Sequence, residues 1–188
     1  MRVPDDRIEQ PRPMRTARLM CVTAVLAITL PGQTAPRDVD GWGKIKWGMT
    51  LADVSRVYEI DRHEDNDFWT QLISQPVDVS DITMKVSFGA KHGSEQVSKV
   101  RLWMTFGRRD STPSASAKDF DTLKTLLIQK YGSPADGETE TEGTDRIRTF
   151  LWTFPSTSIL LTLTQGQNAM GRIDLEYTAT DKKALDAL

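Results

Sequence analysis

Apolar residues alternate with other residues along four stretches of the chain, and this pattern limits the fold more than any other feature of the sequence. The four stretches are Ile82–Phe88, Val97–Phe106, Ser158–Thr164 and Arg172–Thr178. Successive side chains of a β-strand point to opposite faces, so a period of two puts the apolar side chains on one face. One apolar face is typical of antiparallel strands that are covered on one side only. The sequence therefore predicts an antiparallel sheet with one buried face.

The strands belong to two similar halves, at about residues 41–110 and 111–180. Each half begins with apolar residues at spacings of three and four, which predict a helix. These are Leu51, Val54, Val57 and Tyr58, then Phe120, Leu123, Leu126, Leu127 and Tyr131. Each helix precedes three strands, the first of which are Phe68–Ile73 and Ile147–Phe154, and the polar segments 61–67 and 135–145 are expected to be loops. We expect one α+β domain built from two helix–strand–strand–strand units, with both helices packed on one face of the sheet.

The stretch KWGMTLADVSRVY contains the start of the first helix. Thr50 can accept a hydrogen bond from an early helix N–H group, and Asp53 can accept one from the N-cap N–H group. This is a capping box in which Asp replaces the usual Glu or Gln. Ser116 and Asp119 repeat the arrangement at the second helix. The residues of this stretch therefore have folding roles, and none of them requires chemistry.

Residues 1–35 have the pattern of a leader. Arg15 and Arg18 precede an apolar run, Leu19–Leu30, that is too short to cross a bilayer core of about 30 Å as a helix. We expect a signal peptide that begins at Met1 or Met14 and is cut near Ala35, and a mature domain at 36–188. The predicted location is periplasmic or secreted, with no stable membrane span after cleavage. The alternatives are an uncleaved anchor or a buried helix.

The composition excludes some classes of protein. The formal net charge is −2 at pH 7, and no basic block stands out in the mature region, where Arg108-Arg109 is only a pair. Nucleic acid binding requires a concentrated positive surface, so we expect no nucleic acid partner. The single cysteine, Cys21, lies inside the leader. The mature chain would then have no disulfide and would depend on its core for stability.

Few residue patterns point to catalysis or to metal binding. The histidines, His63 and His92, lie in polar segments, where a histidine is usually only solvated, although a Ser–His–acid site built on either remains an alternative. In DRHEDND, the residues Asp61, His63, Asp65 and Asp67 alternate like the first ligands of a calcium loop, but the glycine and the bidentate glutamate of such a loop are missing. The pair Asp174 and Glu176 is expected on the solvated face. We expect no catalytic residue, no metal and no cofactor.

Tryptophan supplies the best candidates for partner binding. Trp103 alternates with Leu102 and Met104, and Trp152 alternates with Leu151, so both indoles are predicted on the face opposite the apolar one. Tryptophan and arginine are enriched among the residues that dominate binding energy at interfaces. Trp103, Trp152 and Arg101 are therefore the candidate partner-binding residues. The alternatives are that loops cover the second face, or that the register differs by one residue.

The stretches WGMTLADV and LIQKYGSP resemble a set of small secreted bacterial proteins that pair a W-G-M-[ST]-x-x-[DE]-V helix start with a K-Y-G-x-P helix end. The duplicated arrangement of a helix with antiparallel strands is also similar to the β-lactamase inhibitor proteins and to the small outer-membrane assembly lipoproteins. The chain lacks the lipid-attachment cysteine of the lipoproteins and is longer, so their role is not carried over. The resemblance implies an exported, non-enzymatic module.

The sequence as a whole predicts an exported binding or scaffold module of a bacterial envelope. Its sheet face or its loops would recognise a protein or a peptide of the envelope. The alternative is a small-ligand carrier, or an enzyme with an unrecognised site. A pocket lined by convergent polar groups would favour that alternative.

Overall fold

The computed structural model describes residues 38–106, 117–166 and 171–180. All of them belong to the second of the two units into which the chain divides, Thr34–Leu188. The predictions for the leader, for Cys21 and for the second N-cap at Ser116 lie outside the described residues. No helix in the described ranges is long and apolar enough to cross a membrane.

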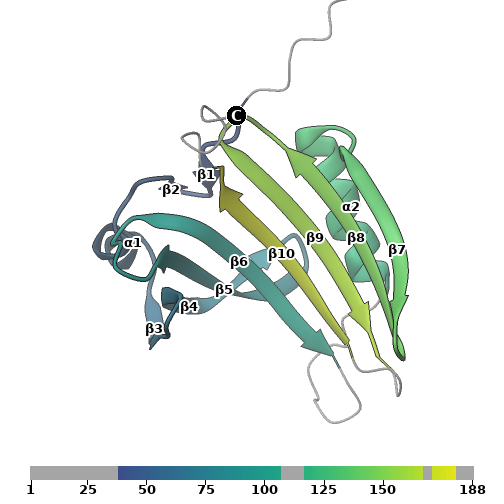
Figure 1. Ribbon diagram of the computed structural model, residues 1–188, viewed down its shortest axis with the longest axis horizontal. Helices are drawn as coiled ribbons and strands as arrows, with labels where there is room; N and C mark the ends of the chain where they lie inside the picture. Colours follow the sequence, from purple (N-terminus) through teal and green to yellow (C-terminus); the bar gives the residue numbers. More distant parts are fainter. Residues whose placement is uncertain (1–37, 107–116, 167–170, 181–188) are drawn as a thin grey trace, which may run out of the picture. The chain divides into compact units, whose positions relative to one another are not determined.

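A single antiparallel sheet of eight strands dominates the described residues (Figure 1). The elements in chain order are β1 (Gly41–Trp42), β2 (Ile45–Lys46), α1 (Leu51–Val57), β3 (Ile60–Asp65), β4 (Trp69–Val79), β5 (Ile82–Lys91), β6 (Val97–Phe106), α2 (Ala117–Tyr131), β7 (Asp136–Glu142), β8 (Asp145–Thr153), β9 (Thr157–Gln165) and β10 (Gly171–Ala179). Strands β1 and β2 form a separate two-stranded sheet. One helix followed by four strands therefore occurs twice along the chain.

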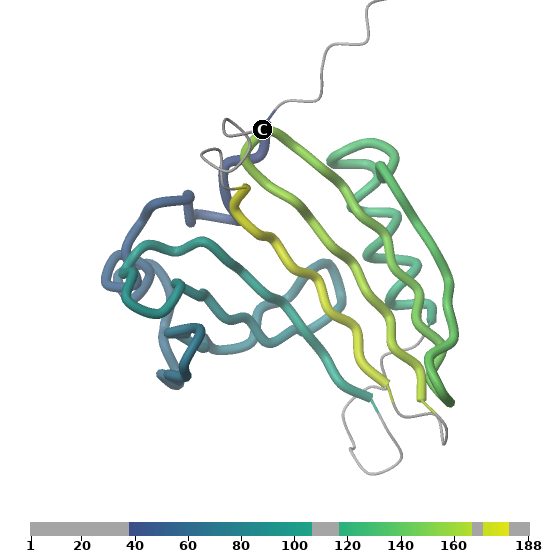
Figure 2. Tube along the Cα trace, in the orientation of Figure 1, coloured from purple at the N-terminus to yellow at the C-terminus, as the bar shows by residue number. Residues whose placement is uncertain are grey.

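The two runs of four strands meet through their last members. The order across the sheet is β3-β4-β5-β6-β10-β9-β8-β7, so β6 and β10 pair at the centre while β3 and β7 form the edges. Figure 2 shows the two central strands side by side. Leu102 of β6 lies opposite Leu175 of β10, with both side chains buried. Each half thus supplies one of its own strands to the junction.

The predicted α+β class, with two helices packed on one face of the sheet, is wrong. Strand residues make up 60% of the structure and helical residues 17%, so the fold is mostly β. The helix α1 has seven residues, and Val54 is its only buried one. The apolar spacing in the sequence located both helices, but it does not reveal how little of the sheet so short a helix can cover.

The prediction of three strands after each helix is also wrong, because the segments predicted as loops contain the strands β3 and β7. Neither strand has an alternating apolar pattern; all seven residues of β7 are exposed, and so are five of the six in β3. An edge strand pairs on one side only, and charged side chains there oppose pairing with another chain. The polarity that indicated loops is therefore the polarity of two protected edges.

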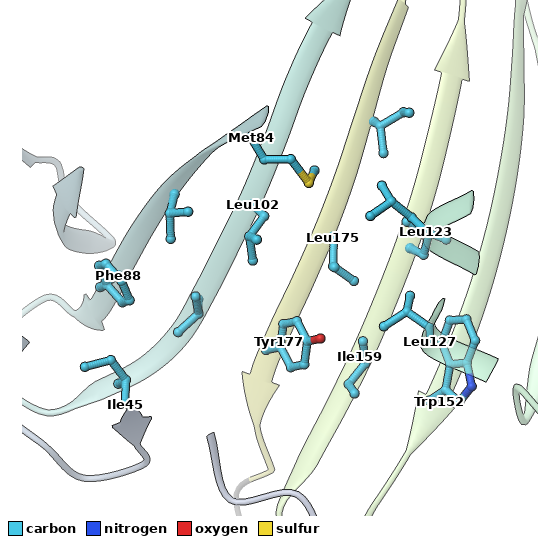
Figure 3. Close-up of a cluster of buried hydrophobic side chains, with 14 of the residues drawn as sticks. Ile45, Met84, Phe88, Leu102, Leu123, Leu127, Trp152, Ile159, Leu175 and Tyr177 are labelled. Carbon is cyan, nitrogen blue, oxygen red and sulfur yellow. The ribbon is translucent and has the colours of Figure 1, made fainter. Parts of the chain in front are cut away.

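The buried face of the sheet carries the main core (Figure 3). Most of the alternating residues that the sequence places on the apolar face are buried as expected, whereas Met104 and Phe106 are only partly buried. The buried ones include Met84, Phe88, Leu102, Ile159, Leu161, Leu163, Ile173, Leu175 and Tyr177. The helix α2 adds Phe120, Leu123 and Leu127 to the same cluster. Burying one such side chain contributes about 1.5–3 kcal/mol, and this core uses no disulfide.

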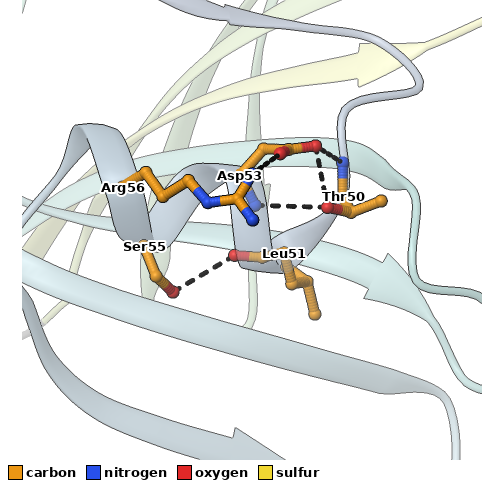
Figure 4. A network of polar contacts seen from close by, with 5 residues as sticks. All are labelled: Thr50, Leu51, Asp53, Ser55 and Arg56. Atoms are coloured by element: carbon orange, nitrogen blue, oxygen red, sulfur yellow. Dashed lines mark hydrogen bonds and ion pairs between the residues drawn. The ribbon is translucent and has the colours of Figure 1, made fainter.

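The start of α1 is the predicted capping box (Figure 4). The Asp53 N–H group donates to Thr50 Oγ1 over 3.2 Å, and the Thr50 N–H group donates to Asp53 Oδ2 over 3.1 Å. The Thr50 hydroxyl, which donates to Asp53 Oδ2 over 2.8 Å, and then the Thr50 N–H group hold the pKa of Asp53 below its ordinary value, and the Arg56 guanidinium 2.8 Å away adds to this effect. Gly48 has φ +88, a conformation that side chains disfavour, so the turn before the helix selects glycine.

Candidate functional site

The face of the sheet opposite the core carries a band of charged residues across its centre. Trp103 lies opposite Asp174, and Arg101 lies opposite Glu176, because β6 and β10 pair in this register. Strict alternation puts these side chains on the other side from Leu102 and Leu175. The predicted positions of Arg101 and Trp103 on the face away from the core are confirmed by this register.

Ion pairs within β10 and between β6 and β10 hold this band in place. Arg101 Nη2 and Arg172 Nε each lie 2.8 Å from the Asp174 carboxylate, and the Arg172 guanidinium lies 5.9 Å from the centre of the Trp103 ring. The Asp174 side chain is 17% exposed, against 40% for Arg101 and 37% for Arg172. The acid is therefore largely covered while both guanidinium groups reach solvent.

The predicted exposure of Trp152 is wrong. The side chain is 1% exposed, and its Nε1–H group donates to the Gly132 carbonyl over 2.8 Å. Trp152 pairs with the buried Ile159, whereas Leu151 pairs with Leu160, which is 36% exposed. The register of β8 is thus opposite to the predicted one, because both Leu151 and Trp152 are apolar and the sequence does not say which of them faces the core. Trp152 anchors the end of α2 and offers no surface to a partner.

A cavity of about 380 Å³ lies where β5 ends, β6 begins and β10 ends. It is lined by Trp47, Gly48, Trp69, Lys91, Ser94, Gln96, Val97, Ser98, Lys99, Thr178, Ala179 and Thr180. The lining combines two indoles, two lysines and several hydroxyl groups, and it contains no acid. The volume falls within the range of small-molecule sites, which is about 300–1,000 Å³.

A β-bulge shapes one wall of this cavity. Gly89 pairs with Lys99 and Ala90 pairs with Val97, so Ser98 is the extra residue on β6 and has no partner on β5. Ser98 Oγ is buried and makes no hydrogen bond within the described part of the chain. A buried hydroxyl without a partner costs about 1–3 kcal/mol, so a cavity that borders one is a candidate binding site.

Gly89 makes room for one of the two indoles. A Cβ atom placed on Gly89 would lie 3.2 Å from Cε3 of Trp69, which is closer than normal packing allows. The Lys99 ammonium lies 4.8 Å from the centre of the same ring and 2.9 Å from Glu176 Oε1. No sequence pattern groups Trp69, Lys91, Ser98 and Lys99 as a site. A glycine inside an apolar alternation was the available signal, because it often marks a bulge or a close approach.

The histidines and the acidic stretch lie on and beside the exposed edge. Asp61, His63 and Asp65 belong to β3, and Asp67 follows it, so the predicted loop is a strand. His92 Nδ1 lies 3.7 Å from Asp65 Oδ1, with both side chains more than half exposed. A hydrogen bond from Thr70 and the nearby His92 lower the pKa of Asp65. Within the described ranges, no cluster of three or more His, Cys, Asp or Glu residues is placed to hold a metal ion.

Comparisons of the chain with protein-family models, with curated proteins and with solved structures found no match. The resemblance of WGMTLADV and LIQKYGSP to exported bacterial proteins therefore stays a prediction. The charged band and the cavity are the two features of the described residues that bear on function.

Proposed function

We propose that this protein is a non-enzymatic binding module of the bacterial envelope, and that the charged band on its open sheet face recognises a protein or peptide partner. The observation that carries the proposal is the arrangement of Arg101, Trp103 and Arg172 around Asp174. Two partly exposed arginine side chains lie beside a tryptophan on the paired central strands β6 and β10. Arginine and tryptophan on a pre-ordered surface are the residues that most often dominate binding energy.

The ion pairs with Asp174 pre-organise the arginine side chains of this surface in the free protein. Ordering a long side chain at an interface costs about 0.5–1.5 kcal/mol, and Asp174 already orders both arginines. A carboxylate of the partner would then complete the coordination of guanidinium groups that are half exposed in the free protein. The proposed partner is accordingly an acidic stretch with at least one aromatic or apolar side chain to contact Trp103.

Site-specific photo-crosslinking tests this proposal. A photoreactive residue at position 103 should crosslink a discrete partner in the envelope fraction of the source cells, whereas the same residue at Lys130 of α2 should not. The partner, once purified, should bind the Trp103→Ala and Arg101→Ala variants at least tenfold more weakly, a difference of about 1.4 kcal/mol. Equal crosslinking from both positions, or unchanged affinity of both variants, would refute recognition by this face.

Export is tested separately by the N-terminus of the mature protein. Cell fractionation followed by mass spectrometry should find a chain that begins near Pro36 and is located outside the cytoplasm. A cytoplasmic chain that retains Met14 would contradict the proposed location. It would leave the binding surface itself unaffected.

A further inference from the structure

We propose that the cavity at the Ser98 bulge is a second binding site, and that it takes a monoanionic carboxylate attached to a flat apolar group. The proposal does not depend on partner recognition by the open face, because neither Arg101 nor Trp103 lines the cavity. Three separate features of the cavity favour such a ligand: the charge of its lining, an unsatisfied hydroxyl group and its aromatic walls.

The charge of the lining favours an anion. Lys91 and Lys99 are the only ionisable side chains among the lining residues, and both are cationic. Glu176 neutralises Lys99 over 2.9 Å, whereas Lys91 forms no ion pair with the part of the chain that the structure describes. One uncompensated ammonium group matches a ligand of charge −1. A phosphate dianion fits less well, because no arginine is present to supply the bidentate contacts that phosphate sites use.

The bulge supplies a hydrogen-bond donor. Ser98 lines the cavity, and its Oγ atom is buried beside it and lacks a partner in the described structure. A carboxylate oxygen that accepts from this hydroxyl would remove the cost of leaving it unsatisfied. A carboxylate offers two oxygens, so it can accept from the Ser98 hydroxyl and from the Lys91 ammonium together.

The aromatic walls favour a flat apolar group next to the carboxylate. Trp47 and Trp69 both line the cavity, and Trp47 Nε1–H donates to Thr157 Oγ1 over 2.6 Å, which fixes the ring. Trp69 is held against Gly89 on one side. The Lys99 ammonium lies 4.8 Å from the centre of the Trp69 ring, so positive charge and aromatic surface adjoin. An aromatic acid would contact both.

Calorimetric titration with a matched pair of compounds tests the site. The probes are 3-phenylpropionate and its neutral amide, 3-phenylpropanamide, and the protein is the mature chain. The acid should bind at least tenfold more tightly than the amide. Equal binding of the two compounds, or no binding of the acid, would overturn the proposal; equal binding would indicate a site for neutral aromatic or sugar-like ligands instead.

Two lysines of the same strand provide the matched variants. Lys85→Gln should leave the affinity for 3-phenylpropionate unchanged, because Lys85 lies on the same exposed face of β5 as Lys91 but does not line the cavity. Lys91→Gln should lower the affinity for 3-phenylpropionate about tenfold and leave the affinity for 3-phenylpropanamide unchanged. Ser98→Ala should lower the affinity for 3-phenylpropionate. Circular dichroism and thermal melting should show that this variant keeps the fold. An acid affinity that is insensitive to Lys91→Gln would contradict the proposal.

The same chemistry has two sources, a free aromatic acid or the carboxyl terminus of a peptide. The tripeptide acetyl-Ala-Ala-Phe with a free carboxylate, and the same peptide as its C-terminal amide, distinguish them. Tighter binding of the free peptide than of 3-phenylpropionate would identify a peptide terminus as the ligand. Tighter binding of 3-phenylpropionate would identify a small molecule. Either outcome, with the amide weaker, supports the carboxylate site.

Discussion

At the scale of single residues, the structure separates side chains that hold the fold from those that are free to bind. Trp152 and Trp103 looked equivalent in the sequence, yet one is 1% exposed and the other belongs to the open face. The difference arises from register, since a shift of one residue exchanges the two faces of a strand. Leu151 and Trp152 are adjacent apolar residues, so the sequence does not show which of the two faces the core. Trp103 lies among Arg101 and Thr105, and there the prediction is confirmed.

The hydroxyl of Tyr177 should make stability depend on alkaline pH. Burial, and next the neighbouring Tyr131, raise the pKa of Tyr177 well above its ordinary value of 10.0. The folded protein therefore keeps the proton while the unfolded chain loses it. This contribution to stability is complete below pH 10 and is lost as the pH rises above it. Urea unfolding should show that the free energy of unfolding falls between pH 8 and pH 11, and that it falls less in Tyr177→Phe than in the unchanged protein. The same pH dependence in both proteins would contradict the assignment.

Thr50 should contribute to stability through the cap of α1. Its Oγ1 accepts from the Asp53 N–H group, and Thr50→Ala leaves that donor without its partner. The expected loss in the free energy of unfolding is about 1 kcal/mol. Ser55→Ala is the control in the same helix, because its hydroxyl bonds only to the Leu51 carbonyl on an exposed surface. Urea denaturation should therefore rank Ser55→Ala as far less destabilising than Thr50→Ala.

At the scale of elements, the two edge strands show where sequence patterns stop being informative. The central strands were predicted because each has one apolar face. β3 and β7 were not, because an edge that must avoid other chains is charged along its length. The capping box at Thr50 was predicted in full, since its signal is local. The cavity was not, because it joins residues from β4, β5, β6 and β10 that only the tertiary structure brings together.

The acidic edge of β7 should keep the protein from associating through that strand. Glu138, Glu140 and Glu142 share one face of β7, opposite Thr149, Ile147 and Asp145 of β8. Replacing the three glutamates by valine should shift the protein toward larger species in size-exclusion chromatography with light scattering. Replacing them by lysine keeps the edge charged and should produce no such shift. Equal behaviour of the valine and lysine variants would show that the charges do not protect the edge.

At the scale of the whole described domain, the two halves share one core through β6 and β10. Residues of both halves belong to the same buried cluster, and Leu102 and Leu175 meet at the junction. Domains that share one core unfold as a unit, so the halves are not expected to be separately stable. The sequence indicated the duplication, but it did not indicate which strands join the copies, because all four alternating stretches have the same pattern.

A substitution at this junction should affect both halves equally. Leu175→Ala should lower the free energy of unfolding by about 2–5 kcal/mol, because it leaves a cavity in the shared core. Hydrogen exchange followed by mass spectrometry should show the loss of protection in peptides from β5 and from β9 alike. Ile128→Ala, at an α2 residue that is 37% exposed, is the control and should change little. A loss confined to the second half would show that the halves open independently.

The pairing of β6 with β10 also sets an order of events for the folding chain. β6 is the fourth strand of the sheet to be synthesised, while its neighbour β10 is the last of the described strands. Until β10 emerges, β6 is an unprotected edge with an apolar face, and closing the long loop between them slows the final pairing.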